Sequence, residues 1–348
     1  MKIRGSYFLC LLVCLFLLGG TALRAQSTDG LNAALDGYDY PFPVNYLPLK
    51  VEGQEVRLAY MDVPASGKPA ATESGDPVRT VVLFHGKNFP GAYWKKTITA
   101  LSEAGFRVVV PDQIGFGKSS KAAIHYSFHE MATHTRQLLE HLKITRVDVI
   151  GHSMGGMLAA RFSLMFPSMV SHLVLEDPIG LEDYRLSIVY VPTSELYDQV
   201  LQETEDQIRD HQAAYYAAWK PDFEEWVQVQ NRLEHGPDAP QVAMASALTS
   251  QMIYEQPVCY EFSKIIAPTL LVVGMKDRTA PGKDRVTPEV AAELGNFPLL
   301  GTKTVAEMPR GKLVELDNVG HIPHLEAPDL FHKELLNFLL RKPAPGER

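Results

Sequence analysis

Cysteine is nearly absent from this chain. Only three cysteines occur in 348 residues, and two of them, Cys10 and Cys14, lie close to the N-terminus. Without those two, Cys259 stands alone, so the rest of the chain cannot close an internal disulfide. Stability must then come from the burial of a large apolar core, and a chain of this length with 46% hydrophobic residues can build one.

The sequence also lacks any run of five or six basic residues. Its 33 Lys and Arg residues are outnumbered by 41 Asp and Glu residues, which gives a formal net charge of −8. A surface that binds nucleic acid needs a concentration of positive charge. We therefore exclude nucleic acid as a partner and expect a small-molecule substrate.

A hydrophobic run long enough to span a membrane is likewise missing. The apolar stretch from Tyr7 to Leu18 covers about a dozen residues, whereas a spanning helix needs about 20. Lys2 and Arg4 precede this stretch and small residues follow it up to Ala25, an order typical of a secretory signal peptide. We expect cleavage near Ala25 and a secreted or periplasmic protein without stable membrane insertion. A membrane anchor and lipidation at Cys14 are the alternatives.

Short β-branched runs recur along the chain, and each ends in a Gly, His or Asp. They cover residues 80–85, 107–112, 146–151, 172–177, 269–274 and 312–317. Stretches with helical spacing lie between or after them, at residues 128–142, 154–166 and 329–340. This alternation predicts an α/β fold, with a mostly parallel central sheet flanked by helices. In such sheets the ligand crevice lies at the carboxyl ends of the strands.

One segment interrupts the alternation. Residues 181–263 contain no strand-like run but show helical patterns, and we interpret them as an inserted helical lid. The expected organisation is a signal peptide (1–25), the first part of the core (26–180), the lid (181–263), the second part of the core (264–342) and a tail (343–348). The prolines of residues 278–311 indicate an irregular excursion, to which the sequence assigns no function.

The pentapeptide Gly151 to Gly155 follows the pattern Gly-x-Ser-x-Gly between a predicted strand and a predicted helix. A side chain at the tip of a sharp strand-to-helix turn needs neighbours without bulk, because the backbone folds tightly around it. We therefore predict that Ser153 is a nucleophile. The alternative is an ordinary glycine-rich turn that opens a helix.

A histidine in the loop after the last strand can reach back over the sheet to this serine. His321 lies there, directly after Gly320, and we predict that it is the general base. His324 is close enough to compete for this role. Three aspartates could orient the base: Asp317 leaves little chain for an approach to the imidazole, whereas Asp177 and Asp277 each follow a strand next to the predicted lid.

The segment His85 to Asn88 follows another predicted strand and offers donors for a negative oxygen. Fixed backbone N–H groups stabilise a tetrahedral intermediate better than mobile water does. We predict that the N–H groups of Lys87 and Met154 form this oxyanion hole, with Phe89 and Tyr93 close to it. The Lys87 ammonium is interpreted either as a solvated charge or as one that faces the substrate.

Metal and cofactor sites are not expected. His125 and His129 have a spacing that can bind a metal on a helix, but no cysteine or acidic cluster completes a site. Trp94, Trp219 and Trp226 either line an apolar pocket or belong to the core.

Together these motifs resemble the α/β-hydrolase superfamily, in its lid-bearing branch. This branch includes esterases, C–C bond hydrolases, haloperoxidase-like enzymes, epoxide hydrolases and haloalkane dehalogenases. The resemblance spans residues 47–340 and rests on His85-Gly86, Asp112 to Ser119, the elbow at Ser153, Asp277 and Gly320-His321. It implies that Asp277 is the acid, because most serine-dependent relatives carry theirs after the strand that follows the lid.

Departures from the family pattern narrow the chemistry. Epoxide hydrolases and dehalogenases of this branch carry Asp where this chain has Ser153, which disfavours alkyl-enzyme chemistry. The resemblance thus implies a serine hydrolase that cleaves a carboxylic ester with a mostly apolar acyl or alcohol part. Hydrolysis of a C–C, lactone or amide bond is the alternative, as is a ligand-binding relative with vestigial activity.

Overall fold

A computed structural model of the chain describes residues 30–70 and 78–341. The expected signal peptide, Cys14 and the tail 343–348 lie outside the described residues. Within them, no helix is both long and apolar enough to cross a bilayer.

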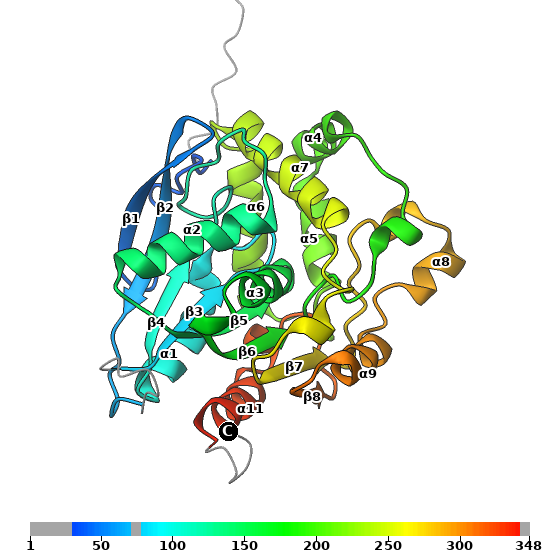
Figure 1. The fold of residues 1–348 in the computed structure, drawn as a ribbon. Coiled ribbons are helices and arrows are strands. Elements are labelled where there is room, and N and C mark those ends of the chain that lie inside the picture. Colours follow the sequence, from blue (N-terminus) through cyan, green and yellow to red (C-terminus); the bar gives the residue numbers. More distant parts are fainter. Residues whose placement is uncertain (1–29, 71–77, 342–348) are drawn as a thin grey trace, which may run out of the picture.

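An eight-stranded sheet forms the centre of the molecule, in the order β1-β2-β4-β3-β5-β6-β7-β8 (Figure 1). The strands are β1 (Val44–Val51), β2 (Gln54–Val63), β3 (Thr80–Phe84), β4 (Arg107–Pro111), β5 (Val147–His152), β6 (Val170–Glu176), β7 (Thr269–Gly274) and β8 (Gly311–Leu316). From β4 to β8 all neighbours are parallel, whereas β2 runs antiparallel to β1 and β4. The predicted α/β fold with a mostly parallel sheet is confirmed, and all six predicted strands are present.

Strands β1 and β2 were not predicted. In β1 only some side chains are buried, as in a strand with one face toward solvent, and Pro48 interrupts its pattern. Proline is confined to strands such as this one at the edge of a sheet, because it cannot donate a ladder hydrogen bond. The inner strands β3, β5 and β7 are buried on both faces and therefore read as continuous apolar runs.

Helices cover both faces of the sheet. On one face α2 and α3 pack together over the inner strands, and on the other face lie α1 and α11 (Figure 1). The helices outside the insertion are α1 (Lys95–Glu103), α2 (Phe128–His141), α3 (Met154–Met165), α8 (Pro288–Glu293), α9 (Phe297–Glu307), α10 (Pro323–Glu326) and α11 (Pro328–Leu340). Short 3₁₀ turns are η1 (Gly91–Trp94), η2 (Pro167–Met169), η3 (Tyr184–Leu186), η4 (Pro221–Phe223), η5 (Phe262–Lys264) and η6 (Lys283–Arg285).

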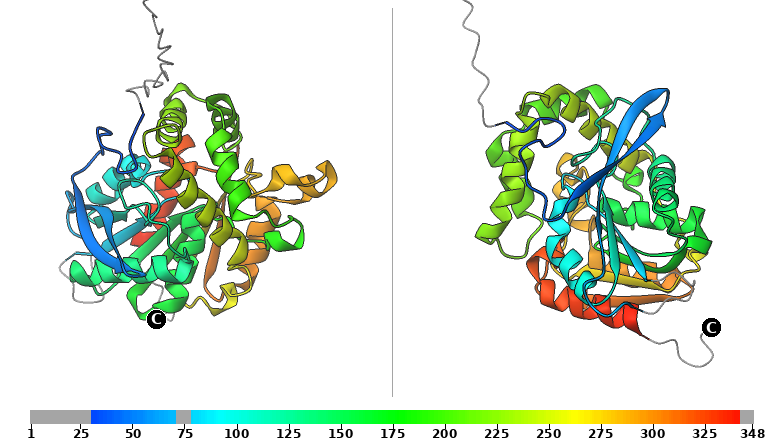
Figure 2. Two further views of the ribbon diagram at one scale, coloured as in Figure 1. Left: turned by 90° about the horizontal axis from the view of Figure 1, so that it is seen from above. Right: turned by 90° about the vertical axis from the view of Figure 1, so that its left-hand side faces the viewer.

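The segment between β6 and β7 is helical, in line with its sequence pattern. It contains α4 (Thr193–Gln202), α5 (Glu205–Ala213), α6 (Glu224–Glu234) and α7 (Ala239–Glu255). Helix α4 packs against α7, and α5 packs against α6. The four helices are grouped at one side of the sheet, at the top of the view in Figure 1, and Figure 2 shows the same grouping from two other directions.

The excursion between β7 and β8 is more regular than the sequence suggested. Residues 278–311 include α8 and α9, and α9 packs against both β7 and β8. Of the three prolines that indicated an irregular path, Pro281 lies outside any helix, whereas Pro288 and Pro298 lie in the first turns of α8 and α9. Proline is favoured there because the first N–H groups of a helix have no intrahelical partner. Pro288 and Pro298 therefore mark helix starts.

The start of α3 fits closely beneath β3. A Cβ atom added to Gly155 would lie 2.2 Å from the carbonyl oxygen of Phe84, and backbone cannot yield as a side-chain tip can. We predict that Gly155→Ala lowers the free energy of unfolding by about 1–3 kcal/mol. Gly301 in α9 is the matched control, because its added Cβ would meet only side-chain atoms of Leu313 and Val273, 3.2 Å or more away. Denaturant unfolding of both variants measures the difference, and equal midpoints would contradict the packing argument.

Candidate active site

The turn between β5 and α3 carries Ser153 in a left-handed backbone conformation, with φ of +56° and ψ of −120°. Few residues other than glycine adopt such a conformation, and it persists only where the surroundings enforce it. Here the Ser153 N–H donates to the carbonyl oxygen of Glu176 at 3.1 Å. A Cβ on Gly151 would lie 2.1 Å from the carbonyl oxygen of Gly155. The spacing of the pentapeptide therefore follows from the tightness of the turn.

Ser153, His321 and Asp277 form one hydrogen-bonded line. The Nε2 atom of His321 lies 2.9 Å from the Ser153 hydroxyl, and its Nδ1 atom lies 2.7 Å from Oδ2 of Asp277. The other carboxylate oxygen of Asp277 accepts the Thr279 N–H at 2.8 Å. All three side chains of the line are buried. Residues separated by 168 positions thus meet at the carboxyl edge of the sheet.

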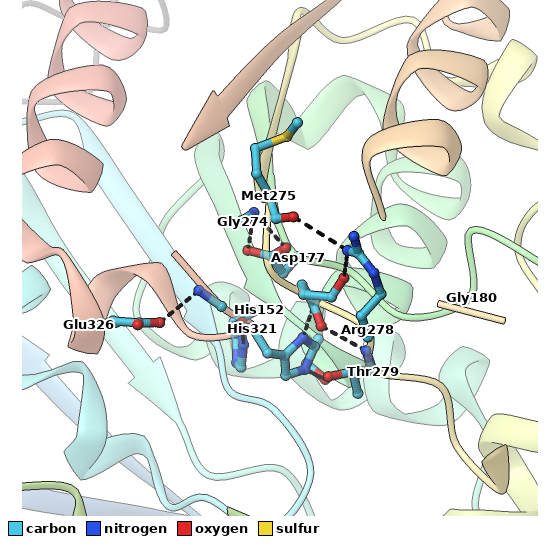
Figure 3. A network of polar contacts seen from close by, with 12 residues as sticks. His152, Asp177, Gly180, Gly274, Met275, Arg278, Thr279, His321 and Glu326 are labelled. Atoms are coloured by element: carbon cyan, nitrogen blue, oxygen red, sulfur yellow. Dashed lines mark hydrogen bonds and ion pairs between the residues drawn. The ribbon is translucent and has the colours of Figure 1, made fainter. Parts of the chain in front are cut away.

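Asp177 lies behind this line and contacts a different group. Both of its carboxyl oxygens accept the N–H of Gly274, at 2.9 and 3.1 Å (Figure 3). Burial raises the pKa of Asp177 well above its usual value, and the nearby Asp277 acts in the same direction. The structure places Asp277 against His321 and Asp177 against the backbone of Gly274, while Asp317 lies in an exposed turn after β8.

The competing histidine, His324, belongs to a separate buried pair. Its Nδ1 atom lies 3.0 Å from Oε1 of Glu176, and its backbone N–H donates to the same oxygen at 2.7 Å. Trp94 stacks on the imidazole ring with a centroid distance of 3.9 Å. These contacts hold the side chain of His324 away from any role in the line formed by Ser153.

Of the two residues predicted to form the oxyanion hole, Met154 directly follows Ser153, and Lys87 lines the same cavity as Ser153. Met154 is the first residue of α3, where a backbone N–H has no acceptor within its own helix. Lys87 follows Gly86, whose α-carbon approaches the serine so closely that a Cβ there would lie 3.3 Å from Cβ of Ser153. The Lys87 ammonium donates to Ser246 in α7 at 2.9 Å and to Asn88 at 3.2 Å. The lysine therefore joins the loop after β3 to the insertion.

A buried carboxylate that the sequence did not point to ties the insertion to the loop of His321. Glu326, labelled in Figure 3, accepts the N–H of Gly320 at 2.7 Å. It also accepts those of Ala217 and Ala218 at 3.0 and 3.3 Å. The His321 N–H donates to the carbonyl oxygen of Tyr215 at 2.6 Å. No local signal could reveal this role, because Ala217 and Glu326 are 109 positions apart.

A cavity of about 1040 Å³ opens on Ser153 and His321. Its wall mixes apolar with ionisable side chains. The apolar members include Ile179, Leu196, Tyr215 and Ile253, and the ionisable ones include Lys87, Glu203, Glu234 and Arg285. Phe89 belongs to this wall, but none of the three tryptophans does: Trp94 and Trp226 are core residues, and Trp219 is 38% exposed.

Among the described residues no group of three His, Cys, Asp or Glu side chains, including His125 and His129, is arranged to hold a metal ion.

The sheet order and this buried line define an α/β hydrolase. A family model described as "alpha/beta hydrolase fold" matches residues 79–328, and the chain therefore belongs to that family. It is a hydrolase of this fold. A probable hydrolytic enzyme from Pseudomonas aeruginosa, known as a crystal structure, is 44% identical, with a TM-score of 0.85 over 89% of this chain and 98% of that one.

Curated relatives are more distant or match in part. A 2-hydroxy-6-oxononadienedioate/2-hydroxy-6-oxononatrienedioate hydrolase from Burkholderia vietnamiensis is 25% identical over 85% of this chain and 95% of its own length. A 2-hydroxy-6-oxo-2,4-heptadienoate hydrolase from Pseudomonas putida is 37% identical over 113 residues, which cover 31% of this chain and 39% of that enzyme.

We predict that Glu326→Ala lowers the free energy of unfolding by about 2–3 kcal/mol, because one buried and two partly buried N–H groups lose their acceptor. Glu326→Gln keeps one acceptor oxygen and should fall between the wild type and the alanine variant. Glu307→Ala, at the exposed end of α9, is the control and should stay within about 0.5 kcal/mol of the wild type. Chemical unfolding ranks the four proteins, and an alanine variant as stable as the control would disprove the anchoring role.

Proposed function

We propose that the protein is a serine hydrolase of the carboxylesterase kind. Ser153 is the nucleophile, His321 the general base and Asp277 the acid that orients the base. The observation that carries this proposal is the buried line from Asp277 Oδ2 through His321 to the Ser153 hydroxyl, with distances of 2.7 and 2.9 Å, at the wall of a large cavity.

The geometry supports two-step acyl transfer. His321 Nε2 takes the proton of the Ser153 hydroxyl while the oxygen attacks the carbonyl carbon of the ester. The N–H groups of Lys87 and Met154 stabilise the negative oxygen of the tetrahedral intermediate. His321 then gives its proton to the leaving alcohol, and the acyl group stays on Ser153. Water, deprotonated by the same imidazole, releases the acid. The Asp277 carboxylate stabilises the imidazolium that forms in both steps.

The cavity wall supports a substrate of small to medium size that is mostly apolar and carries a polar group. Its volume of about 1040 Å³ exceeds what a very short ester needs, and its ionisable side chains do not fit a purely aliphatic compound. Since α4 to α7 contribute much of this wall, we propose that residues 181–263 act as a lid that sets substrate choice. We further propose that the protein is exported after cleavage near Ala25.

Hydrolysis of a carbon–carbon bond is the second candidate. It is favoured by the similarity to two enzymes whose names state that they hydrolyse 2-hydroxy-6-oxo acids. A panel of p-nitrophenyl esters of graded length, set beside a 2-hydroxy-6-oxodienoate, distinguishes the two candidates by the larger kcat/KM.

We predict that Ser153→Ala lowers kcat by about 10⁵- to 10⁶-fold, because no other group can form the acyl-enzyme. A fluorophosphonate should label the wild type at Ser153, as peptide mass spectrometry can show, and should leave the alanine variant unlabelled. Ser163→Ala is the control, since this serine is buried in α3 and its hydroxyl donates to the carbonyl oxygen of Ala159. Hydrolysis that survives in purified Ser153→Ala protein would refute the mechanism.

We predict that Asp277→Asn lowers kcat by about 10⁴-fold, because the amide favours the wrong tautomer of His321. Asp177→Asn should cost far less, since Asp177 does not contact the imidazole and its raised pKa favours a neutral side chain. Parallel kcat measurements decide between the two aspartates. A larger loss in the Asp177 variant would show that the acid is assigned wrongly.

A further inference from the structure

A buried chain of hydrogen bonds runs beside the reactive line without being part of it. The N–H of Gly86 lies 2.9 Å from the Tyr93 hydroxyl oxygen, which lies 3.1 Å from Nδ1 of His152. The Nε2 atom of His152 is 2.8 Å from the carbonyl oxygen of His321. Tyr93 and His152 are 1% and 0% exposed, so water does not compete for these contacts.

The donor and the acceptor of each of these hydrogen bonds are fixed by the chemistry of the groups at the two ends of the series. A backbone N–H can only donate, so the Tyr93 oxygen accepts from Gly86 and its own proton is available to Nδ1 of His152. A carbonyl oxygen can only accept, so Nε2 of His152 carries the proton and donates it to His321. One donor and one acceptor nitrogen make a neutral imidazole. Burial lowers the pKa of His152 well below its usual value, and the neighbouring His321 and His324 act in the same direction.

Three members of this series of hydrogen bonds lie next to, or belong to, a predicted reactive residue. Gly86 directly precedes Lys87, His152 directly precedes Ser153, and the last acceptor is the backbone of His321 itself. These groups come from three different loops, and the contact between His152 and His321 joins residues 169 positions apart. Figure 3 shows His152 beside His321, and their ring centroids are 4.9 Å apart.

We propose that Tyr93 and His152 are positioning residues that hold the oxyanion hole and the general base in register with Ser153. The inference rests on the proposed serine hydrolase function. Without the Tyr93 hydroxyl, the loop that carries the Lys87 N–H loses its fixed point, and the His152 ring loses the donor that sets its tautomer. The donor to the oxyanion is then displaced, and the transition state is less stable, while the contacts of the substrate with the rest of the cavity wall are unchanged.

The ring of Tyr93 is held independently of its hydroxyl. It stacks on Phe89 at a centroid distance of 4.9 Å and meets His324 edge to face at 4.6 Å. Tyr93→Phe therefore removes the polar contacts and keeps the packing. Tyr216→Phe is a matched control, because the Tyr216 hydroxyl is also buried but has no hydrogen-bond partner among the described residues. Its ring stacks on Phe223 at 3.8 Å.

The experiment compares the wild type with the two phenylalanine variants. For Tyr93→Phe we expect kcat on a p-nitrophenyl ester to fall by about tenfold to a hundredfold, with KM changed by less than about twofold. The rate of fluorophosphonate labelling at Ser153 should fall by a similar factor. The midpoint of thermal unfolding should lie below that of Tyr216→Phe, because the buried Gly86 N–H and His152 Nδ1 lose their partner, and kcat is therefore measured well below both midpoints. The control should keep the kcat of the wild type. Equal kcat values for the two variants, or a loss that appears only in KM, would overturn the proposal.

A double-mutant cycle tests whether the two residues act as one unit. His152→Gln can still donate to the His321 carbonyl but offers no acceptor at the position of Nδ1. Because Tyr93 acts partly through His152 and partly on the Gly86 N–H directly, adding Tyr93→Phe to His152→Gln should lower kcat by a smaller factor than Tyr93→Phe does in the wild type, whereas fully multiplicative effects would overturn the inference. Failure of the proposed function is recognisable separately, because the wild type itself would then not react with the fluorophosphonate.

Discussion

The left-handed backbone of Ser153 is the constraint on which the site depends. It requires glycine on both sides of the turn, brings the start of α3 against the carbonyl oxygen of Phe84, and leaves the serine hydroxyl at the carboxyl edge of the sheet. The strain is held by its surroundings: a hydrogen bond from the Ser153 N–H to Glu176 and the close packing of the start of α3 against β3 fix the turn. Because the sheet is parallel from β4 onward, the loops after β3, β5, β7 and β8 all end at this edge. Ser153, Asp277 and His321 lie in three of these loops, and the parallel direction of the strands therefore brings them together.

The base is held through its backbone as well as through its ring. The N–H of His321 donates to Tyr215 in the insertion, and its carbonyl oxygen accepts from His152 beside the nucleophile. Asp277 fixes the ring from behind. Buried polar groups are costly unless they are paired, so each of these contacts also contributes to the stability of the fold. Support for the reaction geometry and support for the fold are therefore provided by the same hydrogen bonds.

Local sequence patterns predicted those features that are determined by neighbouring residues, namely the inner strands and the turn at Ser153. The inner strands are buried on both faces and carry continuous apolar runs, and the elbow follows from glycine spacing, so both could be found in advance. Position after the last strand sufficed to find His321. Strand β1, the helices that begin at Pro288 and Pro298, and the role of Glu326 could not be found in this way. Strand β1 is only partly buried and so lacks a continuous apolar run. A proline fits both an irregular loop and the first turn of a helix. The role of Glu326 rests on contacts between residues far apart in sequence.

The anchoring of the insertion by Tyr215 and Glu326 limits how this enzyme can diversify. Helices α4 and α7 contribute side chains to the cavity, so substitutions there, outside the Ser246 contact with Lys87, can alter the fit of a ligand while the reaction geometry stays intact. The backbone of Tyr215, Ala217 and Ala218 has no such freedom, because the Tyr215 carbonyl oxygen is a partner of His321 and the two alanine N–H groups are partners of Glu326. A chimaera that takes its insertion from a relative has to preserve this short stretch of backbone. Helix α4 can therefore be exchanged more freely than the backbone of Tyr215, Ala217 and Ala218, which has to keep its position beside the reaction centre.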